Sequence, residues 1–283
     1  MKKNSFLITL VLTIFCFNML SAQQKSCCTS GATNEFAMLG SDAAFKSAHL
    51  SPEPFHFVAS KGGEISFPVT GGNDAKAFFV KAGNQSTKYL FIFHEWWGLN
   101  DYMKQEAERF AMDFPDVNIM AIDLYDGKIA TNAEDAGKLM QSMDKARGEA
   151  IIQGAQNYVG PSASIQTLGW CFGGGWSMQA AILLGKQATG CVIYYGMPES
   201  DQKKLSTLNA PVFGIFALKD EWITKTIVEA FEAKMKELQK PVTINFFNAD
   251  HAFANPSNPK FDEAATAKAR IMAVGFLKKN FGK

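Results

Sequence analysis

Three side chains in the second half of the chain have the types that nucleophilic catalysis requires: Cys171, Asp220 and His251. An activated thiol can attack a carbonyl carbon and form a covalent intermediate. A histidine can take up the thiol proton and deliver it to the leaving group, while a carboxylate orients the histidine and stabilises the imidazolium. The three residues occur in the order nucleophile, acid, base. They therefore predict a cysteine-based catalytic triad.

Cys171 stands at the centre of the sequence Gly-Trp-Cys-Phe-Gly, which has the form G-x-C-x-G. An apolar strand pattern at 165–168 precedes it, and a helical pattern at 176–184 follows it. This is the context of a nucleophile elbow, in which glycines permit a strained apex and close packing of the chain. We expect the N-terminus of the helix to favour the thiolate over the thiol. The alternative is a small buried hydrophobic side chain, the usual fate of a free cysteine.

The acid and the base also have alternatives. His251 could be an ordinary loop histidine, and Asp220 has rivals in Glu221 and Asp250. Asp250 directly precedes the histidine and is therefore poorly placed to orient it. The positions of Asp220 and His251 after the elbow favour the catalytic interpretation, since this order is the one that α/β-hydrolases share.

The elements that must position these residues are apolar strands that alternate with amphipathic helices. Strand patterns lie at residues 64–69, 75–80, 88–94, 117–122, 165–168, 190–195, 212–218 and 242–247. Helical patterns lie at residues 101–114, 132–159, 176–184, 224–239 and 262–281. The alternation predicts an α/β fold with a mostly parallel central sheet, helices on both faces and an antiparallel edge formed by the first two strands. Functional residues then collect at the carboxyl ends of the strands.

Glu95 follows the strand pattern at 88–94 and precedes two tryptophans. A carboxylate in such an apolar position is costly unless it has a partner. One hypothesis is that Glu95 hydrogen-bonds or exchanges a proton with Cys171 and holds the thiol in check until substrate arrives. The alternative is an ion pair with a nearby lysine or arginine, because buried charges are usually paired. The metalloprotease motif H-E-x-x-H is excluded because Gly98 occupies the position of its second histidine.

The oxyanion hole of such a site comes from two backbone N–H groups. In this chain they belong to Phe172, directly after the nucleophile, and to Trp96, after the third strand. Aromatic side chains near the same edge of the sheet predict the walls of a substrate pocket, although such residues are as often plain core or rim residues. The predicted pocket residues are Trp97, Tyr125, Tyr195 and Trp222.

The composition argues against several classes of partner. The chain has 283 residues, 47% of them hydrophobic, and a formal net charge of +1. This balance gives no electrostatic basis for binding nucleic acid or an anionic membrane surface. The sequence shows no internal repeat, no low-complexity linker and no second globular domain after residue 60, so we assign 60–283 to one catalytic domain.

Residues 1–22 have the features of a secretory signal peptide. A basic start is followed by an apolar core at 6–17 and by a small-residue cleavage site that ends at Ala22. The pattern predicts export to the periplasm or out of the cell. It is too short for a stable membrane span, so none is expected after its removal.

Residues 23–59 are polar and weakly periodic, which predicts a leader or a surface arm that could become ordered by docking. The adjacent Cys27 and Cys28 could pair with another thiol, bind a metal or do neither. A zinc site there has little support because no histidine or second cysteine pair is near. Cys191 lies inside a strand pattern, and we expect it to pack in the core.

The motifs together resemble those of the dienelactone hydrolase family over about residues 60–283. The matching stretches are His-Glu-Trp-Trp-Gly-Leu-Asn at 94–100, Asp-Leu-Tyr-Asp-Gly at 123–127, Gly-Trp-Cys-Phe-Gly-Gly at 169–174, Tyr-Tyr-Gly at 194–196 and Asp-His-Ala-Phe at 250–253. The resemblance implies an α/β-hydrolase fold that hydrolyses small esters or lactones through a Cys-His-Asp triad and a thioester. It implies no metal, no cofactor and a monomeric protein.

The chain departs from the family pattern at Asn255, where dienelactone hydrolases have an arginine that grips the substrate carboxylate. A dienelactone would therefore lack one of its usual contacts. Two other functions remain open on the same residues. One is an acyltransferase or thioesterase with the same triad, and the other is a binding protein that keeps the fold without the activity.

Overall fold

The computed structural model describes residues 31–282, so the predicted signal peptide and the pair Cys27 and Cys28 lie outside the described residues. An eight-stranded sheet has the order β1-β2-β4-β3-β5-β6-β7-β8. Its strands are β1 (Gly63–Phe67), β2 (Ala75–Val80), β3 (Lys88–Phe93), β4 (Asn118–Ile122), β5 (Ser164–Trp170), β6 (Ala188–Tyr194), β7 (Val212–Ala217) and β8 (Val242–Phe247). Strand β2 is antiparallel to β1 and to β4, and all other neighbours are parallel. The predicted antiparallel edge is confirmed.

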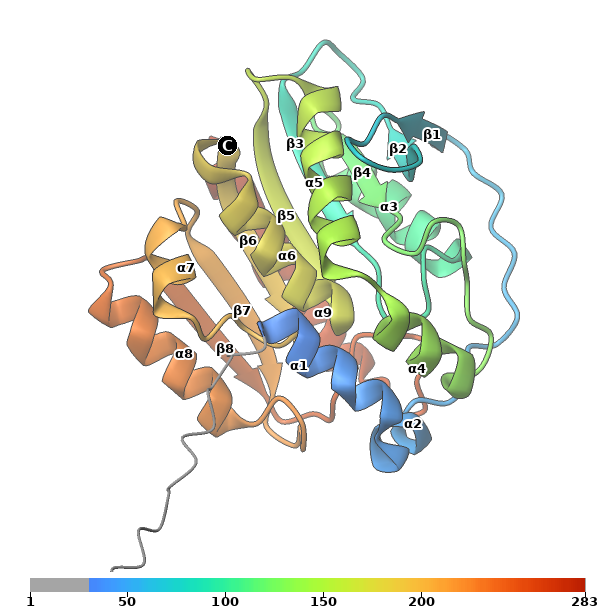
Figure 1. The fold of residues 1–283 in the computed structure, drawn as a ribbon, viewed down its shortest axis with the longest axis vertical. Helices are drawn as coiled ribbons and strands as arrows, with labels where there is room; N and C mark the ends of the chain where they lie inside the picture. Colours follow the sequence, from blue (N-terminus) through green and yellow to red (C-terminus); the bar gives the residue numbers. More distant parts are fainter. Residues whose placement is uncertain (1–30, 283) are drawn as a thin grey trace, which may run out of the picture.

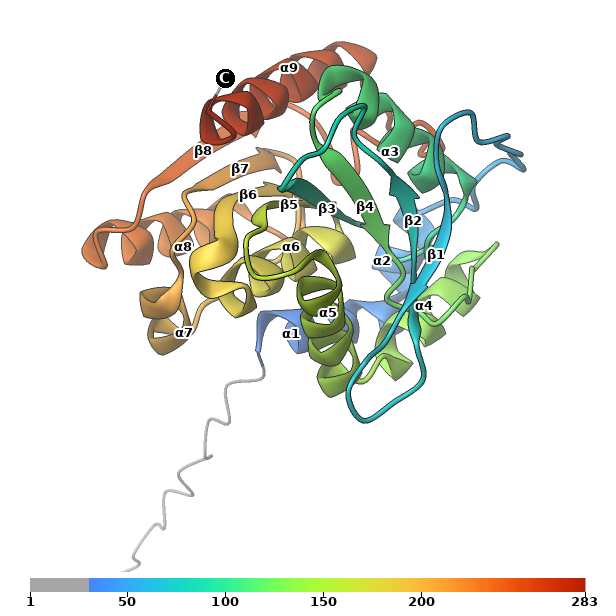
Figure 2. The same cartoon turned by 90° about the horizontal axis from the view of Figure 1, so that it is seen from above.

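Helices cover both faces of the sheet (Figure 2). On one face lie α3 (Asp101–Asp113) and α9 (Glu263–Asn280), and on the other lie α5 (Lys145–Val159), α6 (Phe172–Leu183) and α8 (Lys225–Glu237). The helices α1 (Ala32–Met38), α2 (Ala43–Ala48), α4 (Ala133–Ser142) and α7 (Gln202–Thr207) complete the described chain, with short 3₁₀ turns at Leu39–Ser41 and Gly185–Gln187. This is the predicted α/β-hydrolase architecture.

The central strands read as continuous apolar runs because they are covered on both faces. Every residue of β4 and of β7 is buried. The edge strand β1, by contrast, buries only Phe67 fully. The core therefore runs along both faces of the parallel part of the sheet, which is the part that carries the functional loops.

Side chains at the helix starts satisfy free backbone N–H groups: at the start of α3, Asn100 accepts a hydrogen bond from the N–H of Met103. Helix α6 begins earlier than its sequence pattern, at Phe172 rather than at 176. Three glycines at 173–175 hide the helical period in the sequence, because they carry no apolar side chains. Packing requires at least one of them, since a Cβ on Gly173 would lie 2.2 Å from the carbonyl oxygen of Phe93.

Residues 31–49, which we call the N-terminal helical segment, are not an exposed arm but are ordered by docking on the catalytic domain. The helices α1 and α2 of this segment pack beside α4, and α1 also packs on α6 (Figure 1). Phe36 and Phe45 are fully buried in the core. The sequence hid this arrangement because each short helix carries one large buried aromatic residue in otherwise small and polar surroundings, which leaves no apolar period to detect.

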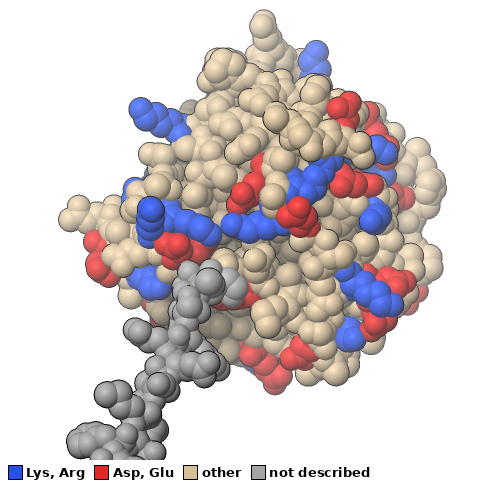
Figure 3. Space-filling view, viewed as in Figure 1, with Lys and Arg blue, Asp and Glu red and all other residues tan. Residues whose placement is uncertain are grey.

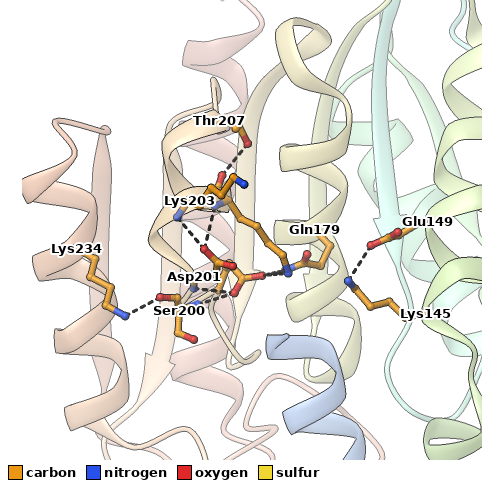
Figure 4. Close-up of polar contacts among 10 residues, drawn as sticks. Lys145, Glu149, Gln179, Ser200, Asp201, Lys203, Thr207 and Lys234 are labelled. Atoms are coloured by element: carbon orange, nitrogen blue, oxygen red, sulfur yellow. Dashed lines mark hydrogen bonds and ion pairs between the residues drawn. The ribbon is translucent and has the colours of Figure 1, made fainter. Parts of the chain in front are cut away.

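The connection between β6 and β7 contains α7. Polar contacts fasten it to its neighbours (Figure 4). The buried carboxylate of Glu199 accepts hydrogen bonds from Gln179 at 2.9 Å and from Lys204 at 2.9 Å. It also accepts from the backbone N–H groups of Ser200 and Asp201, each at 2.9 Å. These contacts fix the chain just beyond the carboxyl end of β6.

The surface carries both signs of charge. On the face shown in Figure 3, basic and acidic side chains lie interspersed and form no field of one sign. Among residues 31–282, no helix combines the length and the apolar character that crossing a membrane requires.

Candidate active site

The predicted triad is assembled at the carboxyl edge of the parallel sheet. Cys171 follows β5, Asp220 lies beyond the end of β7, and His251 lies beyond the end of β8. The Nε2 atom of His251 is 3.4 Å from the Cys171 sulfur, and its Nδ1 atom is 2.6 Å from Asp220 Oδ2. The nucleophile, the base and the acid therefore form one continuous chain of contacts.

Asp220 is the acid of this chain of contacts because its backbone surroundings hold it in place. Its Oδ1 atom accepts hydrogen bonds from the N–H groups of Trp222 at 2.9 Å and Ile223 at 2.8 Å, which leaves Oδ2 for the histidine. The rival Asp250 is instead paired with Lys260 at the surface, at 2.8 Å. Contact with His251 and backbone hydrogen bonds lower the pKa of Asp220 despite its burial, so it is a carboxylate at neutral pH.

Cys171 sits at the apex of a strained turn, as its glycine neighbours indicated. Its φ of 54° and ψ of −120° lie in a region that L-residues rarely adopt. A Cβ on Gly169 would lie 2.0 Å from the carbonyl oxygen of Gly173, so only glycine fits there. The strand and the helix are thereby brought close enough to present the sulfur at the sheet edge.

Two backbone N–H groups converge on the Cys171 sulfur, and they belong to Phe172 and Trp96. These are the two donors that the sequence predicted for an oxyanion hole. Burial raises the pKa of the Cys171 thiol well above its usual value, Glu95 raises it further, and the two N–H groups only partly offset this. The N–H of Phe172 at the start of α6 favours the thiolate, as expected, but burial and Glu95 outweigh it, so the pKa of the resting thiol is raised overall.

Glu95 is buried beside the triad and forms no ion pair with a lysine or arginine within residues 31–282. Tyr195 donates a hydrogen bond to Glu95 Oε1 at 3.4 Å, and the side-chain amide of Asn255 donates to Oε2. Burial raises the pKa of Glu95 to about 7. No hydrogen bond joins Glu95 to Cys171 in the described part of the chain, so its influence on the thiol is through charge.

His49 is a buried member of the site that the sequence did not reveal. It follows α2, and its ring centre lies 5.2 Å from that of His251 and 4.9 Å from that of Trp96. Burial, and then the neighbouring His251, lower the pKa of His49 to about 3, so its ring is neutral. Because His49 precedes the predicted domain, only the docking of the N-terminal helical segment brings it here. We find no sequence signal that could have indicated this role.

Two hollows flank the triad, while Cys171 itself is only 1% exposed. The larger, of about 320 Å³, lies between α3 and α9 and is lined by Glu95, Trp97 and Asn255 among others. The smaller, of about 310 Å³, is lined by His49, Trp222 and His251 among others. Glu95 and His251 thus each border one hollow, and the sulfur is covered between them.

Of the four predicted pocket residues, two line the hollows and two are buried beside the triad. Trp97 lines the larger hollow and Trp222 the smaller. Tyr195 is fully buried, with its ring centre 5.2 Å from that of His251. Tyr125 packs against Phe172, and its buried hydroxyl has no hydrogen-bond partner in the part of the chain that the structure describes. The structure therefore places all four around the triad, but it does not gather them into one open pocket.

Comparisons with known proteins find relatives in a family of hydrolases. The model of the dienelactone hydrolase family matches residues 76–281. The protein usf of Aquifex pyrophilus is 29% identical over 203 residues, which are 67% of this chain and 87% of that protein. Carboxymethylenebutenolidase 1 of Cupriavidus pinatubonensis is 25% identical over 239 residues, which are 78% of this chain and 97% of that enzyme.

Solved structures agree on the fold. A dienelactone hydrolase-like promiscuous phosphotriesterase from metagenomic libraries superposes with a TM-score of 0.67 at 19% identity, covering 78% of this chain and 99% of the other. The family match includes the end of β3, the turn that carries Cys171 and the loops that carry Asp220 and His251, so it spans the elements that position the triad and Glu95 but not the segment that carries His49. The chain belongs to the dienelactone hydrolase family.

Proposed function

We propose that the protein is an exported hydrolase of small esters or lactones that works through Cys171 and a thioester intermediate. Membership of a hydrolase family supports the reaction class. The observation that carries the mechanism is the chain of contacts from Asp220 through His251 to Cys171, at 2.6 Å and 3.4 Å, with two N–H groups converging on the sulfur.

In the proposed mechanism, the Cys171 thiol gives its proton to His251 Nε2 as the sulfur attacks the carbonyl carbon. Asp220 stabilises the imidazolium that forms. The negative oxygen is held by the N–H groups of Phe172 and Trp96. The alcohol then leaves with the proton from His251, and a thioester remains. Water, deprotonated by His251, attacks the thioester, and the carboxylic acid and the free thiol are released.

Glu95 supplies the restraint on the nucleophile in this proposal. Its pKa of about 7 means that it is close to half ionised at neutral pH. An ionised Glu95 keeps the proton on the Cys171 sulfur, because two negative charges in one buried place are costly. Polar groups of a bound substrate that screen or neutralise Glu95 lower the cost of forming the thiolate.

The proposed substrates are small and lack a required carboxylate. Asn255 replaces the arginine of the family pattern, and its amide hydrogen-bonds Glu95. The larger hollow, of about 320 Å³, is at the lower end of the size range of small-molecule sites and borders Glu95 directly. A compact ester or lactone fits that volume better than an extended one.

Export and the monomeric state are further parts of the proposal. Export is supported by the basic start, apolar core and small-residue site within residues 1–22. The mass of the protein recovered from its native host would begin after Ala22 or nearby, and retention of Met1 would refute export by this route. Light scattering of the mature protein should give the mass of a single chain.

The experiment that tests the proposed reaction is hydrolysis of a panel of small esters and lactones by the mature protein. Cys171→Ala should abolish turnover, and Cys191→Ala should retain it, because Cys191 is buried away from the triad beside Ser177. Trapping of an acyl group on Cys171 by mass spectrometry would demonstrate the thioester.

The two alternatives predict different outcomes of the same experiment. Turnover that requires an added alcohol, amine or thiol acceptor, or a thioester substrate, indicates the transferase or thioesterase. Tight binding of panel members without any turnover, in a protein whose Cys171 resists alkylation, indicates the binding protein and overturns the proposed hydrolase.

A further inference from the structure

Three metal-ligand types meet around the nucleophile: His49, Cys171 and His251. All three side chains are buried, and their ligand atoms lie within 4.8 Å of one another. The distance from His251 Nε2 to the Cys171 sulfur is 3.4 Å. Around a tetrahedral zinc ion, with bonds of about 2.0–2.3 Å, ligand atoms are separated by roughly 3.4–3.6 Å. The distances between the ligand atoms therefore need to shorten by only about 1 Å for the three side chains to bind one cation.

The orientation of both imidazoles is already the one that metal ligation requires. His251 contacts Asp220 through Nδ1 at 2.6 Å, and His49 contacts the carbonyl oxygen of Phe45 through Nδ1 at 2.7 Å. Metal-binding histidines almost always donate the distal N–H to a carboxylate or a carbonyl in this way, which fixes the tautomer and exposes the other nitrogen. The Nε2 atoms of both residues are thereby left as acceptors.

The Nε2 atom of His49 has no partner in the resting site among the described residues. It is buried, and no hydrogen-bond partner from residues 31–282 reaches it. Such an orphaned buried nitrogen costs free energy unless something binds it. The triad does not use this nitrogen, because the imidazole that links the sulfur to Asp220 is that of His251. The third ligand is therefore present without a role in the proposed hydrolysis.

We propose that His49, Cys171 and His251 bind one zinc ion and that the bound ion blocks the catalytic thiol. A thiolate and two imidazoles are ligands that Zn²⁺ prefers, and they leave a fourth position for water. Binding exchanges the thiol proton for a sulfur–zinc bond, and the proton passes to solvent. Zinc binding itself is independent of the proposed hydrolysis, whereas inhibition rests on it.

A route to this site exists from the surface. The smaller hollow, of about 310 Å³, is lined by both His49 and His251. Glu221 and Asp250 line it together with Lys219 and Lys260, and Asp250 is paired with Lys260, so the charges of its walls are balanced. An ion that enters here reaches the imidazoles without displacing the sheet or α6. The N-terminal helical segment thus supplies a ligand and one wall of the route.

The test is zinc binding by the mature full-length protein, measured by equilibrium dialysis, with Mg²⁺ as the hard-cation control. We expect one Zn²⁺ per chain, release of a proton on binding, and at least a tenfold slower alkylation of Cys171. X-ray absorption of the zinc-loaded protein should fit one sulfur and two imidazole nitrogens. A shell with two sulfurs, or no zinc bound, overturns the site.

Substitutions of single residues test which side chains bind the zinc ion. Cys171→Ala and His49→Gln should each weaken zinc binding by at least tenfold, on the scale seen when metal sites lose supporting groups. The matched control His56→Gln alters an exposed histidine and should bind zinc as the parent does. Cys27→Ser combined with Cys28→Ser should also leave binding unchanged. Loss of zinc in that double variant together with retention in His49→Gln would falsify the proposal.

Failure of the two proposals can be told apart. Zinc that binds with one sulfur and two nitrogens in a protein without ester turnover upholds the metal site and removes the hydrolase. If the protein hydrolyses esters but binds no zinc, and zinc does not slow turnover, the hydrolase is upheld and the metal site is removed. If His49→Gln disturbs docking of the N-terminal helical segment, the absorption spectrum of the parent protein still decides the ligand set.

Discussion

The side-chain amide of Asn255 donates a hydrogen bond to the carboxylate of Glu95, and these residues come from opposite ends of the catalytic domain. The contact holds Glu95 with a neutral partner rather than a cation. Because a neutral amide offsets less of the cost of burial than an arginine would, the pKa of Glu95 stays raised, at about 7. The identity of residue 255 thus sets the charge of the group that restrains the nucleophile.

Glu95→Gln should make Cys171 more reactive, and increasingly so as pH rises. Ionised Glu95 raises the pKa of the Cys171 thiol, and glutamine carries no charge. We expect alkylation of Cys171 to be on the order of tenfold faster above pH 7. Below the Glu95 pKa of about 7 the two proteins should converge, because the parent carboxyl is then protonated. Glu221→Gln, at the surface, is the control, and an identical pH dependence in all three proteins would remove Glu95 as a restraint.

The same group should make stability depend on pH. The pKa of Glu95 rises from 4.5 in the unfolded chain to about 7 in the folded protein, so the folded state binds the proton more tightly. This contribution is fully present below pH 4.5 and is lost as pH rises through about 7. It is worth on the order of 3 kcal/mol. Urea unfolding of the parent and of Glu95→Gln across pH 4.5–8 should show this difference, and parallel curves would contradict it.

Continuous apolar strands and the residues that follow them were predictable because both signals are local. β7 and β8 end shortly before Asp220 and His251, so the sheet alone brings these side chains to one edge. The elbow was predictable because the glycines at 169 and 173 have no room for a side chain. The sequence carries these features in runs of adjacent residues.

The environment of the sulfur was not predictable, because it depends on distant parts of the chain. α1 and α2 have only seven and six residues, and each buries one phenylalanine. Nothing local indicates that they close over the triad and bring His49 with them. The same burial reverses the expected direction of the Cys171 pKa, which the helix N-terminus alone would have lowered.

Asp220→Asn should reduce kcat on the order of 10³–10⁴-fold, because asparagine neither stabilises the imidazolium nor fixes the productive tautomer of His251. The change keeps the shape of the side chain and the acceptor for the N–H groups of Trp222 and Ile223. The protein should therefore stay folded, which thermal unfolding would check. Asp250→Asn is the matched control, because that carboxylate pairs with Lys260 at the surface. Equal losses in the two variants would mean that Asp220 is not the orienting acid.

Phe45→Ala should uncover the nucleophile. The Phe45 ring lies 5.2 Å from Trp96, 5.1 Å from Trp222 and 5.7 Å from His251, measured between ring centres. Its truncation removes packing worth about 3–5 kcal/mol. That loss falls on a segment of two short helices, so we expect the segment to open locally before the sheet unfolds.

The measurement for Phe45→Ala is the alkylation rate of Cys171 beside limited proteolysis within residues 31–49. Both should increase relative to the parent, while the thermal transition of the sheet core shifts less. Phe55→Ala is the matched control, because Phe55 is part-exposed and stacks on Tyr102 away from the triad. Faster proteolysis with unchanged alkylation would show that the segment covers the site without controlling access to the sulfur. Substrate would then have to reach Cys171 from the side of Glu95, through the hollow between α3 and α9.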